Sequence, residues 1–244
     1  MFHVEMKQKK TVNALPQRCL EWLVTSRMNF INEMKEGKPL RYFSAHLPVM
    51  ATWPASMCNG GNGGNDDVVD TGYPVNMTVK GIGLIPRDEL LTSFTEMFET
   101  ITVSSRTKPH MESITERVGA INKLYGDIGN FDPSVLGGLE IFGGKTLDNL
   151  NENSNASLLY VGMHQADGAS AGGGMGVSYI SFQVNGHIEI LNKNNPYYRF
   201  LLASRKLFEF DKFHIFQPDY PFGYLIKIKE VLDKSPWSKA STGH

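Results

Sequence analysis

Cysteine is scarce in this sequence, and its scarcity excludes a fold built on disulfides. The chain has 244 residues but only two cysteines, Cys19 and Cys58, and neither stands in a CxxC pair or another spacing typical of metal ligands. A chain of this length can bury a large core without covalent cross-links. These features indicate a protein of a reducing compartment, so we expect a cytoplasmic location.

The sequence also lacks an excess of charge of either sign. Lysine and arginine together number 24 and aspartate and glutamate 25, which gives a net charge of -1 at pH 7. No domain-wide basic field is available to attract nucleic acid or anionic lipid. No run approaches the roughly 18 apolar residues of a membrane span, and Met1 to Lys10 contains no apolar signal-peptide segment. We therefore expect neither nucleic acid nor a membrane as a partner.

Several common catalytic and metal-binding motifs are absent. The sequence contains no GxxxxGK[ST], HExxH or GxSxG pattern and no paired CxxC. Its seven histidines are scattered without the spacing of metal ligands, so we predict no metal site. These absences leave the catalytic residues, if there are any, unknown from sequence.

What the sequence does contain is an ordinary globular composition, with 41% hydrophobic residues, and clear helical patterns. Apolar residues recur at three- and four-residue steps from Leu15 to Lys35, which predicts an amphipathic helix in an N-terminal segment 1–40. Two further helices are expected at about Arg87 to Ile101 and Met111 to Tyr125. We interpret residues 87–133 as a helical insertion.

The rest of the chain has the pattern of β-strands. Apolar or alternating runs bounded by turn residues predict strands within Arg41–Trp53, Tyr73–Ile85, Leu139–Phe142, Ala156–Met163, Val177–Leu191 and Gly223–Leu232. Because most follow one another directly, they predict an antiparallel sheet or barrel in a domain spanning 41–237, followed by a flexible tail, 238–244. Alternation predicts that the inward side chains include Ile141, Leu158, Tyr160, Phe182, Val184, Ile188 and Ile226.

Two glycine-rich runs are interpreted as loops. The run NGGNGGN at Asn59 to Asn65 predicts a surface loop, since a calcium-binding nonapeptide repeat would need several stacked copies. The run from Gln165 to Gly176 lies between two strands, so it predicts a hairpin loop and not a dinucleotide-binding turn, which must open a helix.

The most informative segment is Leu139 to Val161, where a strand reaches two glycines and then a short helix. Gly143 and Gly144 would let the backbone approach a ligand closely, and Lys145 would bring positive charge. Thr146 would add a hydroxyl and a backbone N–H near the start of a helix, where anions bind well. Together these residues predict a phosphate-binding site. A plain strand–turn–helix connection is the alternative reading of the same pattern.

This pattern resembles the FMN-binding split β-barrel family, the pyridoxamine 5'-phosphate oxidase-like proteins. Their segment K-x-x-N-L-x-x-[ND]-P resembles the run from Lys145 to Ser154. Asn149, Leu150 and Asn153 match the pattern, Lys145 stands one residue further from Asn149 than the pattern has it, and Ser154 replaces the usual proline. Asp70 to Pro74 resembles the D-x-G-x-P hairpin between the first two strands of that family. Tyr179 to Leu191 resembles its strand–turn–strand about a central Gly186, Tyr197 to Phe208 its helix, and Tyr224 to Val231 its closing strand.

The resemblance implies a mainly β (α+β) fold, namely an antiparallel split β-barrel with an N-terminal helix and a helical insertion. It also implies a homodimer with FMN at the subunit interface. The residues that it assigns to the cofactor are Phe142, Gly143, Gly144, Lys145, Thr146 and Asn149. The arginine-rich C-terminal motif of true pyridoxamine phosphate oxidases is missing, since the chain ends with Pro236, Trp237 and a polar tail.

Several functions remain open at this stage. The first is an FMN-dependent oxidoreductase of a small organic substrate, in which the flavin carries hydride or single electrons. The second is a non-catalytic flavin- or haem-binding protein on the same barrel, since a fold does not fix a function. A deazaflavin-dependent reductase is the third.

Overall fold

The structure is a computed structural model, and it describes residues 10–38, 45–57, 74–141, 143–165, 177–207 and 220–236. Several sequence predictions fall outside these residues. They are the loop at Asn59 to Asn65, most of the Asp70 to Pro74 segment, the tip of the Gln165 to Gly176 hairpin, Phe142 and the tail 238–244.

One antiparallel sheet of eight strands forms the frame of the molecule, with the strand order β3-β2-β6-β7-β8-β5-β4 and β1 paired to β8. The strands are β1 (Lys10–Val12), β2 (Val49–Thr52), β3 (Asn76–Val79), β4 (Ile82–Pro86), β5 (Phe131–Glu140), β6 (Asn155–Gln165), β7 (Val177–Leu191) and β8 (Phe222–Asp233). Gln165 pairs with Val177, so β6 and β7 are the arms of the predicted hairpin.

The sheet curves back on itself because its two end strands are neighbours in the sequence. β3 ends at Val79 and β4 begins at Ile82, so only Lys80 and Gly81 separate opposite ends of the strand order. The backbone N–H of Ile82 donates to the carbonyl of His46 at 2.9 Å, which holds this corner against the approach to β2. The predicted antiparallel split barrel is therefore confirmed.

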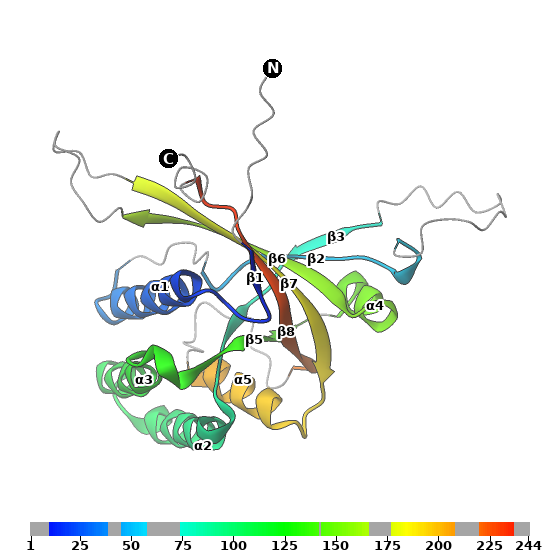
Figure 1. Cartoon of the computed structure of the whole chain (residues 1–244). Helices are drawn as coiled ribbons and strands as arrows, with labels where there is room; N and C mark the ends of the chain where they lie inside the picture. The colour runs from blue at the N-terminus through cyan, green and yellow to red at the C-terminus, as the bar shows by residue number, and fades with distance from the viewer. Residues whose placement is uncertain are drawn as a thin grey trace, which may run out of the picture.

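The helices lie on one side of the sheet, except for α4, which lies beside β2 and β3 (Figure 1). The described residues contain α1 (Gln17–Lys35), α2 (Asp88–Ser104), α3 (His110–Tyr125), α4 (Lys145–Glu152) and α5 (Pro196–Leu207), and short 3-10 turns at Ala55–Met57, Ser105–Thr107 and Ile128–Asn130. The predicted N-terminal helix, the helical insertion and the helix before the closing strand are confirmed. None of the described helices has the length and apolar character needed to cross a membrane.

The core lies between the sheet and α1, α2, α3 and α5. Trp22 of α1 packs edge-on against Tyr160 of β6, with ring centroids 6.2 Å apart, and also against Phe182 of β7. The predicted inward residues are buried, with one exception. Ile141 is only partly buried, because it lies past the end of β5 where the chain turns toward α4.

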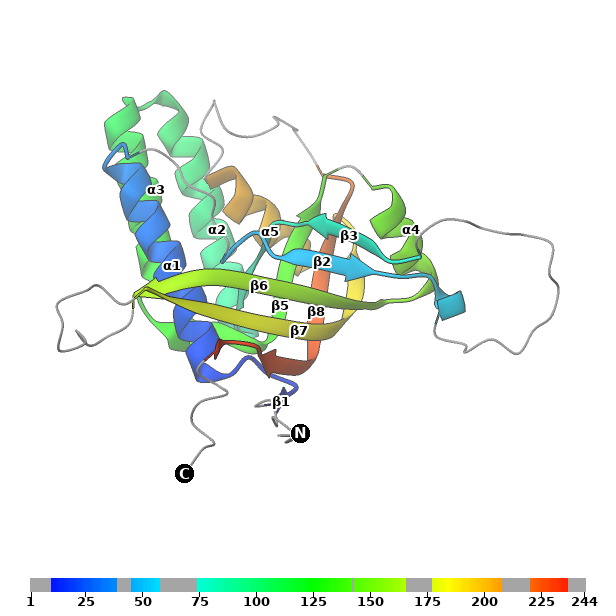
Figure 2. The ribbon, with the colours of Figure 1, turned by 90° about the horizontal axis from the view of Figure 1, so that it is seen from above.

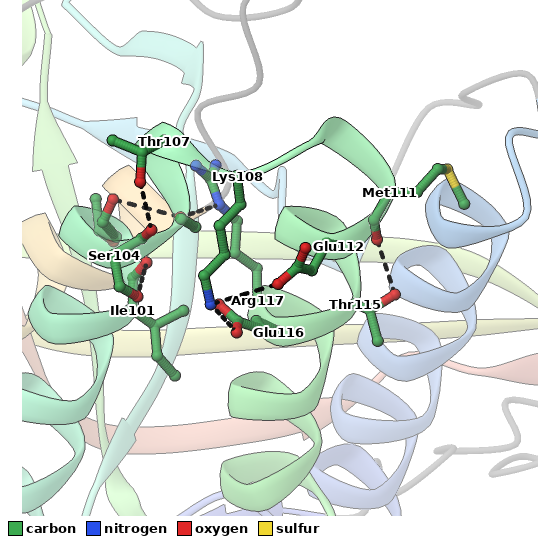
Figure 3. A network of polar contacts seen from close by, with 11 residues as sticks. Ile101, Ser104, Thr107, Lys108, Met111, Glu112, Thr115, Glu116 and Arg117 are labelled. Atoms are coloured by element: carbon green, nitrogen blue, oxygen red, sulfur yellow. Dashed lines mark hydrogen bonds and ion pairs between the residues drawn. The ribbon is translucent and has the colours of Figure 1, made fainter.

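The α2–α3 pair is fixed at its connecting turn by polar contacts (Figure 3). Lys108 forms ion pairs with Glu112 and Glu116 of α3, and its hydrogen bond to Glu116 is the main cause of its raised pKa. The buried guanidinium of Arg117 donates from Nε to Ser105 Oγ at 2.9 Å. These contacts tie the two helices of the insertion together.

Three sequence predictions were wrong in detail. The run Tyr73–Ile85 forms two strands joined at the barrel corner, not one. β5 begins at Phe131, inside the segment assigned to the helical insertion and well before Leu139. The predicted strand began only after Gly137 and Gly138. A Cβ at Gly138 would lie 2.4 Å from the Gly81 carbonyl oxygen, so the close approach of the backbone requires glycine within this strand.

The expected strand–turn–strand at Tyr179–Leu191 is the third error. These residues belong to one strand, β7, whose pairing with β8 shifts register between Asn185 and Gly186. A Cβ at Gly186 would lie 2.8 Å from a methyl of Ile226 and 3.0 Å from the carbonyl of Lys227. The central glycine therefore marks a bulge in a continuous strand.

Candidate functional site

The predicted phosphate site is a glycine turn at the start of α4. Gly143 and Gly144 have φ angles of 68° and 76°, the left-handed region that glycine adopts without strain. Gly144 is the N-cap of α4 and supplies no side-chain cap. The N–H groups of Lys145 and Thr146 are the first of the helix and have no intrahelical acceptor, so this turn can offer donors to an anion.

Lys145 adds a positive charge to these donors. Its side chain is exposed, and among the described residues it forms no ion pair or hydrogen bond. A cation at the first position of a helix is slightly unfavourable, because the helix dipole is positive there. An anion bound at the turn would interact favourably with both the Lys145 ammonium and the positive end of the helix dipole, so the lysine would then be stabilising.

Two other predicted site residues, Thr146 and Asn149, have buried side chains that hold α4 in place. Thr146 Oγ1 accepts a hydrogen bond from Asn76 of β3 at 2.9 Å, and Asn149 donates to Thr52 of β2 at 3.2 Å. Asn153 just beyond the helix donates to the carbonyl of Trp53 at 3.2 Å. The side chains therefore anchor α4 to the β2–β3 pair, and a cofactor contact of Thr146 or Asn149 stays a prediction.

The structure adds Glu140, which the sequence reasoning missed. This last residue of β5 is fully buried, and its carboxylate accepts hydrogen bonds from Lys80 Nζ at 2.8 and 2.6 Å. It also accepts from the Tyr224 hydroxyl and from the N–H groups of Ile141, at 3.0 Å, and Gly143, at 3.2 Å. The only sequence signal was an acidic residue between the apolar Leu139 and Ile141.

The environment of this carboxylate affects Tyr224 as well. Burial raises the pKa of the Tyr224 hydroxyl, and the hydrogen bond to Glu140 and its negative charge raise it further. Tyr224 therefore stays protonated and acts as a donor. Lys80 neutralises Glu140, so the exposed groups that carry charge at the start of α4 are the ammonium of Lys145, beside the glycine turn, and the carboxylate of Asp148, further along the first turn of the helix.

A small cavity lies elsewhere, between α1, β4 and β6, with Leu23, Ile82 and Tyr160 in its wall. Its volume is about 10 Å³, enough for one water molecule but not for an organic cofactor. The buried hydroxyl of Tyr160 has no hydrogen-bond partner among the described residues, and burial raises its pKa. The glycine turn, at the surface, is the better candidate for a ligand site.

No metal centre is formed by the part of the chain that the structure describes. Within it, no group of three or more His, Cys, Asp or Glu side chains is placed to hold a metal ion. The described cysteine, Cys19, is buried as a free thiol, and burial is the main cause of its raised pKa.

Comparison with known proteins gives structural neighbours only. No protein-family model matches the chain, and no curated protein matches it. One solved neighbour is HupZ of Group A Streptococcus, at 11% identity and a TM-score of 0.36 over 78% of this chain and 86% of that chain. A candidate pyridoxamine 5'-phosphate oxidase from Lactobacillus delbrueckii has 15% identity and a TM-score of 0.36 over 92% and 98%. An FMN-binding protein from Syntrophomonas wolfei has 11% identity and a TM-score of 0.38 over 90% and 93%.

With TM-scores below 0.5, the neighbours do not carry the fold assignment, which rests on the strand order and the corner between β3 and β4. The chain is an antiparallel split barrel that resembles the pyridoxamine 5'-phosphate oxidase-like proteins in its motif at Lys145 to Asn153.

Proposed function

We propose that this protein binds FMN, with the flavin phosphate at the glycine turn before α4. The observation that carries the proposal is the unpartnered ammonium of Lys145 at a helix start that has no side-chain cap. A phosphate there would accept hydrogen bonds from the first N–H groups of α4 and pair with Lys145. FMN is the cofactor of the family that the sequence motif resembles, and the position of that motif locates the phosphate at the start of α4. One structural neighbour is also an FMN-binding protein.

The residues at the turn fit a phosphate group well. Gly143 and Gly144 have no Cβ to obstruct an approaching oxygen atom. Apart from their chain neighbours, Leu147 is the one described residue within 4 Å of where a Cβ would be. Thr146 and Asn149 fix the axis of α4 through their contacts with β3 and β2, so the helix dipole has a set direction. When bound, FMN would supply hydride or single-electron transfer, and the protein would orient it and limit access to its ring.

We propose that the activity is oxidation or reduction of a small organic substrate. A non-catalytic flavin- or haem-binding protein and a deazaflavin-dependent reductase are the alternatives, and neither is favoured by a particular residue of the described structure. We expect a cytoplasmic protein, because cysteine is scarce and the cysteine that the structure describes, Cys19, is a free thiol.

We further propose that the protein is a homodimer formed through one open face of the sheet. Exposed apolar side chains gather on the outer side of β3, β6 and β7, and this outer face consists of Val75, Met77, Val79, Leu159, Val161, Met163 and Tyr179. Met77 and Met163 are 68% and 71% exposed. The strand pairs Val79–Val49–Leu159 and Met163–Tyr179 make the face continuous, and no described helix covers it (Figure 2).

The charge pattern of the outer face favours a second copy of the same chain as its occupant. In a two-fold symmetric dimer the same surface meets itself, so a charged residue near the axis would face its like. β2, β3 and β6 contain no Asp, Glu, Lys or Arg. Charge appears on β7 and β8, where Glu189 pairs with Lys227, and at Glu230 of β8, which pairs with Lys10 of β1. Such a neutral, apolar surface is compatible with itself.

The absorbance spectrum of the purified protein tests the proposed function. We expect the bands of a flavin, either as purified or after FMN is added and unbound FMN is removed. Deazaflavin and haem have different spectra, so either of these chromophores would contradict the FMN proposal. Bleaching by a reduced nicotinamide and recovery with an electron acceptor would support an oxidoreductase, whereas a bound flavin that never turns over would support the non-catalytic alternative.

A further inference from the structure

One buried carboxylate connects three parts of the chain beside the glycine turn. Glu140 ends β5, Lys80 lies at the corner between β3 and β4, and Tyr224 belongs to β8. Lys80 donates to both carboxylate oxygens, the Tyr224 hydroxyl donates to Oε2, and the N–H groups of Ile141 and Gly143 donate to Oε1. The glycine turn is thus attached to the closed corner of the barrel through Glu140.

The turn needs such an attachment because its backbone is intrinsically free. Two successive glycines, Gly143 and Gly144, have more accessible conformations than any other pair of residues, and ordering them costs conformational entropy. A hydrogen bond from Gly143 N–H to a fixed carboxylate restricts this freedom before any ligand arrives. A ligand that finds its donors already placed loses less entropy on binding.

Stability alone is a poor reason for this arrangement. A buried ion pair loses hydration on folding, and replacing such a pair with well-packed hydrophobic side chains of similar size is often neutral or stabilising. Side-chain exposure is 0% for Glu140 and 14% for Lys80, so both groups have lost most of their water. A role in fixing geometry explains their presence better.

We infer that Glu140 is a positioning residue for the phosphate site: it holds the glycine turn so that the first N–H groups of α4 and Lys145 meet a phosphate together. The inference rests on the proposed function, because it concerns the same site. Glu140 itself does not contact the phosphate. Its negative charge is balanced by Lys80, so it fixes the turn without repelling the anion at longer range.

The test is a double variant that removes the ion pair but leaves the net charge unchanged, Lys80→Met with Glu140→Gln. A single amide oxygen cannot serve Tyr224 and both backbone N–H groups as the carboxylate does. The matched control is Arg18→Met with Asp233→Asn. Asp233 is also a buried carboxylate that accepts from an arginine, at 2.8 Å, and from a backbone N–H, at 2.9 Å, but it lies at the opposite end of β8.

Both double variants and the parent are titrated with FMN and with riboflavin, which is FMN without its phosphate. We expect the Lys80/Glu140 variant to bind FMN about tenfold more weakly than the parent and riboflavin equally well. The Arg18/Asp233 variant should bind both flavins as the parent does. A purely structural role of Glu140 would not change the ratio of the two affinities.

The outcomes separate the inference from the proposed function. If the parent prefers FMN and the Lys80/Glu140 variant keeps the full preference, Glu140 does not position the site. If the parent itself shows no preference for FMN over riboflavin, the phosphate site fails and the inference fails with it. Should the double variant not fold, Tyr224→Phe removes one donor from the carboxylate, and a preference lowered about two- to threefold is expected; an unchanged preference would overturn the inference.

Discussion

Single glycines determine how closely the strands of this barrel approach one another at its corner. Gly138 of β5 faces the backbone of Gly81, and Gly137 faces side chains of Ile85 and Leu201. The sequence shows these glycines but not why they are needed, because the atoms that lie against them come from the β3–β4 corner, β4 and α5. Close approach at this corner is what allows the two end strands of the sheet to be joined by two residues.

The substitution Gly138→Ala should therefore destabilise the protein. Its new Cβ would lie 2.4 Å from the Gly81 carbonyl oxygen, which belongs to the backbone and cannot move away cheaply. We expect a loss of roughly 1 to 3 kcal/mol in the free energy of unfolding, measured by urea denaturation. Gly119→Ala in α3 is the control. No described atom outside the backbone of α3 and the neighbours of Gly119 in the chain lies within 4 Å of the added Cβ, and alanine should raise stability by up to about 1 kcal/mol. Equal stability of both variants would show that the corner is not tightly packed.

The hydroxyl of Tyr197 links α5 to α2 and predicts an alkaline loss of stability. It donates a hydrogen bond to Asp88, and burial, followed by this bond and the nearby carboxylates, raises the pKa of Tyr197 to about 12. An unfolded tyrosine ionises near pH 10. The folded state thus holds the proton more tightly, and this contribution is present below about pH 10 and lost as the pH rises toward 12.

We expect Tyr197→Phe to lower the free energy of unfolding near neutral pH and the difference from the parent to shrink above about pH 10. Urea denaturation over a series of pH values measures this difference. A Tyr197→Phe effect that stayed constant up to pH 12 would contradict the assigned hydrogen bond.

At the scale of elements, α4 depends on its neighbours more than on its own sequence. It has only eight residues, and an isolated helix of that length is unstable in water. Buried side chains attach it to β2 and β3 through Thr146 and Asn149. The position of the candidate phosphate site is therefore a property of three elements together.

Asn149→Ala tests this attachment. Its amide donates to the fully buried Thr52 hydroxyl, which would lose a partner, so we expect the protein without ligand to lose about 1 to 3 kcal/mol. Asn151→Ala, an exposed position on the same helix, is the matched control and should have little effect. If Asn149 serves only a cofactor, the free protein would unfold at the same denaturant concentration as the parent.

The sequence predicted some elements well for identifiable reasons. The helical stripe from Leu15 to Lys35 follows one period over its whole length, and it closes with Gly37 at a φ of 68°. The alternating run Val177–Leu191 also predicted β7 with its bounds, and only the family resemblance implied a turn at Gly186. Prediction was poorer for β5, whose glycines serve close packing but were left outside the predicted strand. A glycine looks the same in a turn, a bulge and a crowded strand, and only the neighbouring strands distinguish these cases.

Only the part of the candidate site that is local in sequence could be predicted. Gly143, Gly144 and Lys145 are local in sequence and could be recognised together. Glu140 could not be recognised as part of the site, because its partners Lys80 and Tyr224 are 60 and 84 residues away along the chain. Such contacts depend on the register of strands that are distant in sequence, and local patterns carry no information about that register.

At the scale of the whole molecule, the sheet has two unlike sides. One side is covered by α1, α2, α3 and α5, and the outer face is left uncovered by any described helix (Figures 1 and 2). Monomeric proteins seldom leave a broad continuous apolar surface in water. A substitution in the outer face therefore tests the proposed dimer.

Leu159→Glu should break the proposed dimer. Leu159 lies in the row Val79–Val49–Leu159, and a charge there would be desolvated at the interface. We expect light scattering to give twice the 27.2 kDa chain mass for the parent and the mass of one chain for the variant. Val103→Glu, an exposed change on α2, should leave the dimer intact. A parent protein that is monomeric with its cofactor bound would contradict the proposal.

The most direct test of the central claim is a titration of FMN into the parent and Lys145→Ala, with Lys123→Ala as a control for loss of an exposed lysine far from the site. Loss of a charge-assisted contact of roughly 1.5 to 3 kcal/mol should weaken FMN binding by Lys145→Ala about ten- to a hundredfold. The same variant without ligand should be as stable as the parent or slightly more stable, because a cation is removed from the positive end of α4. Lys123→Ala should bind FMN as the parent does. Equal FMN affinity in the Lys145→Ala variant, or no FMN binding by the parent, would contradict the account.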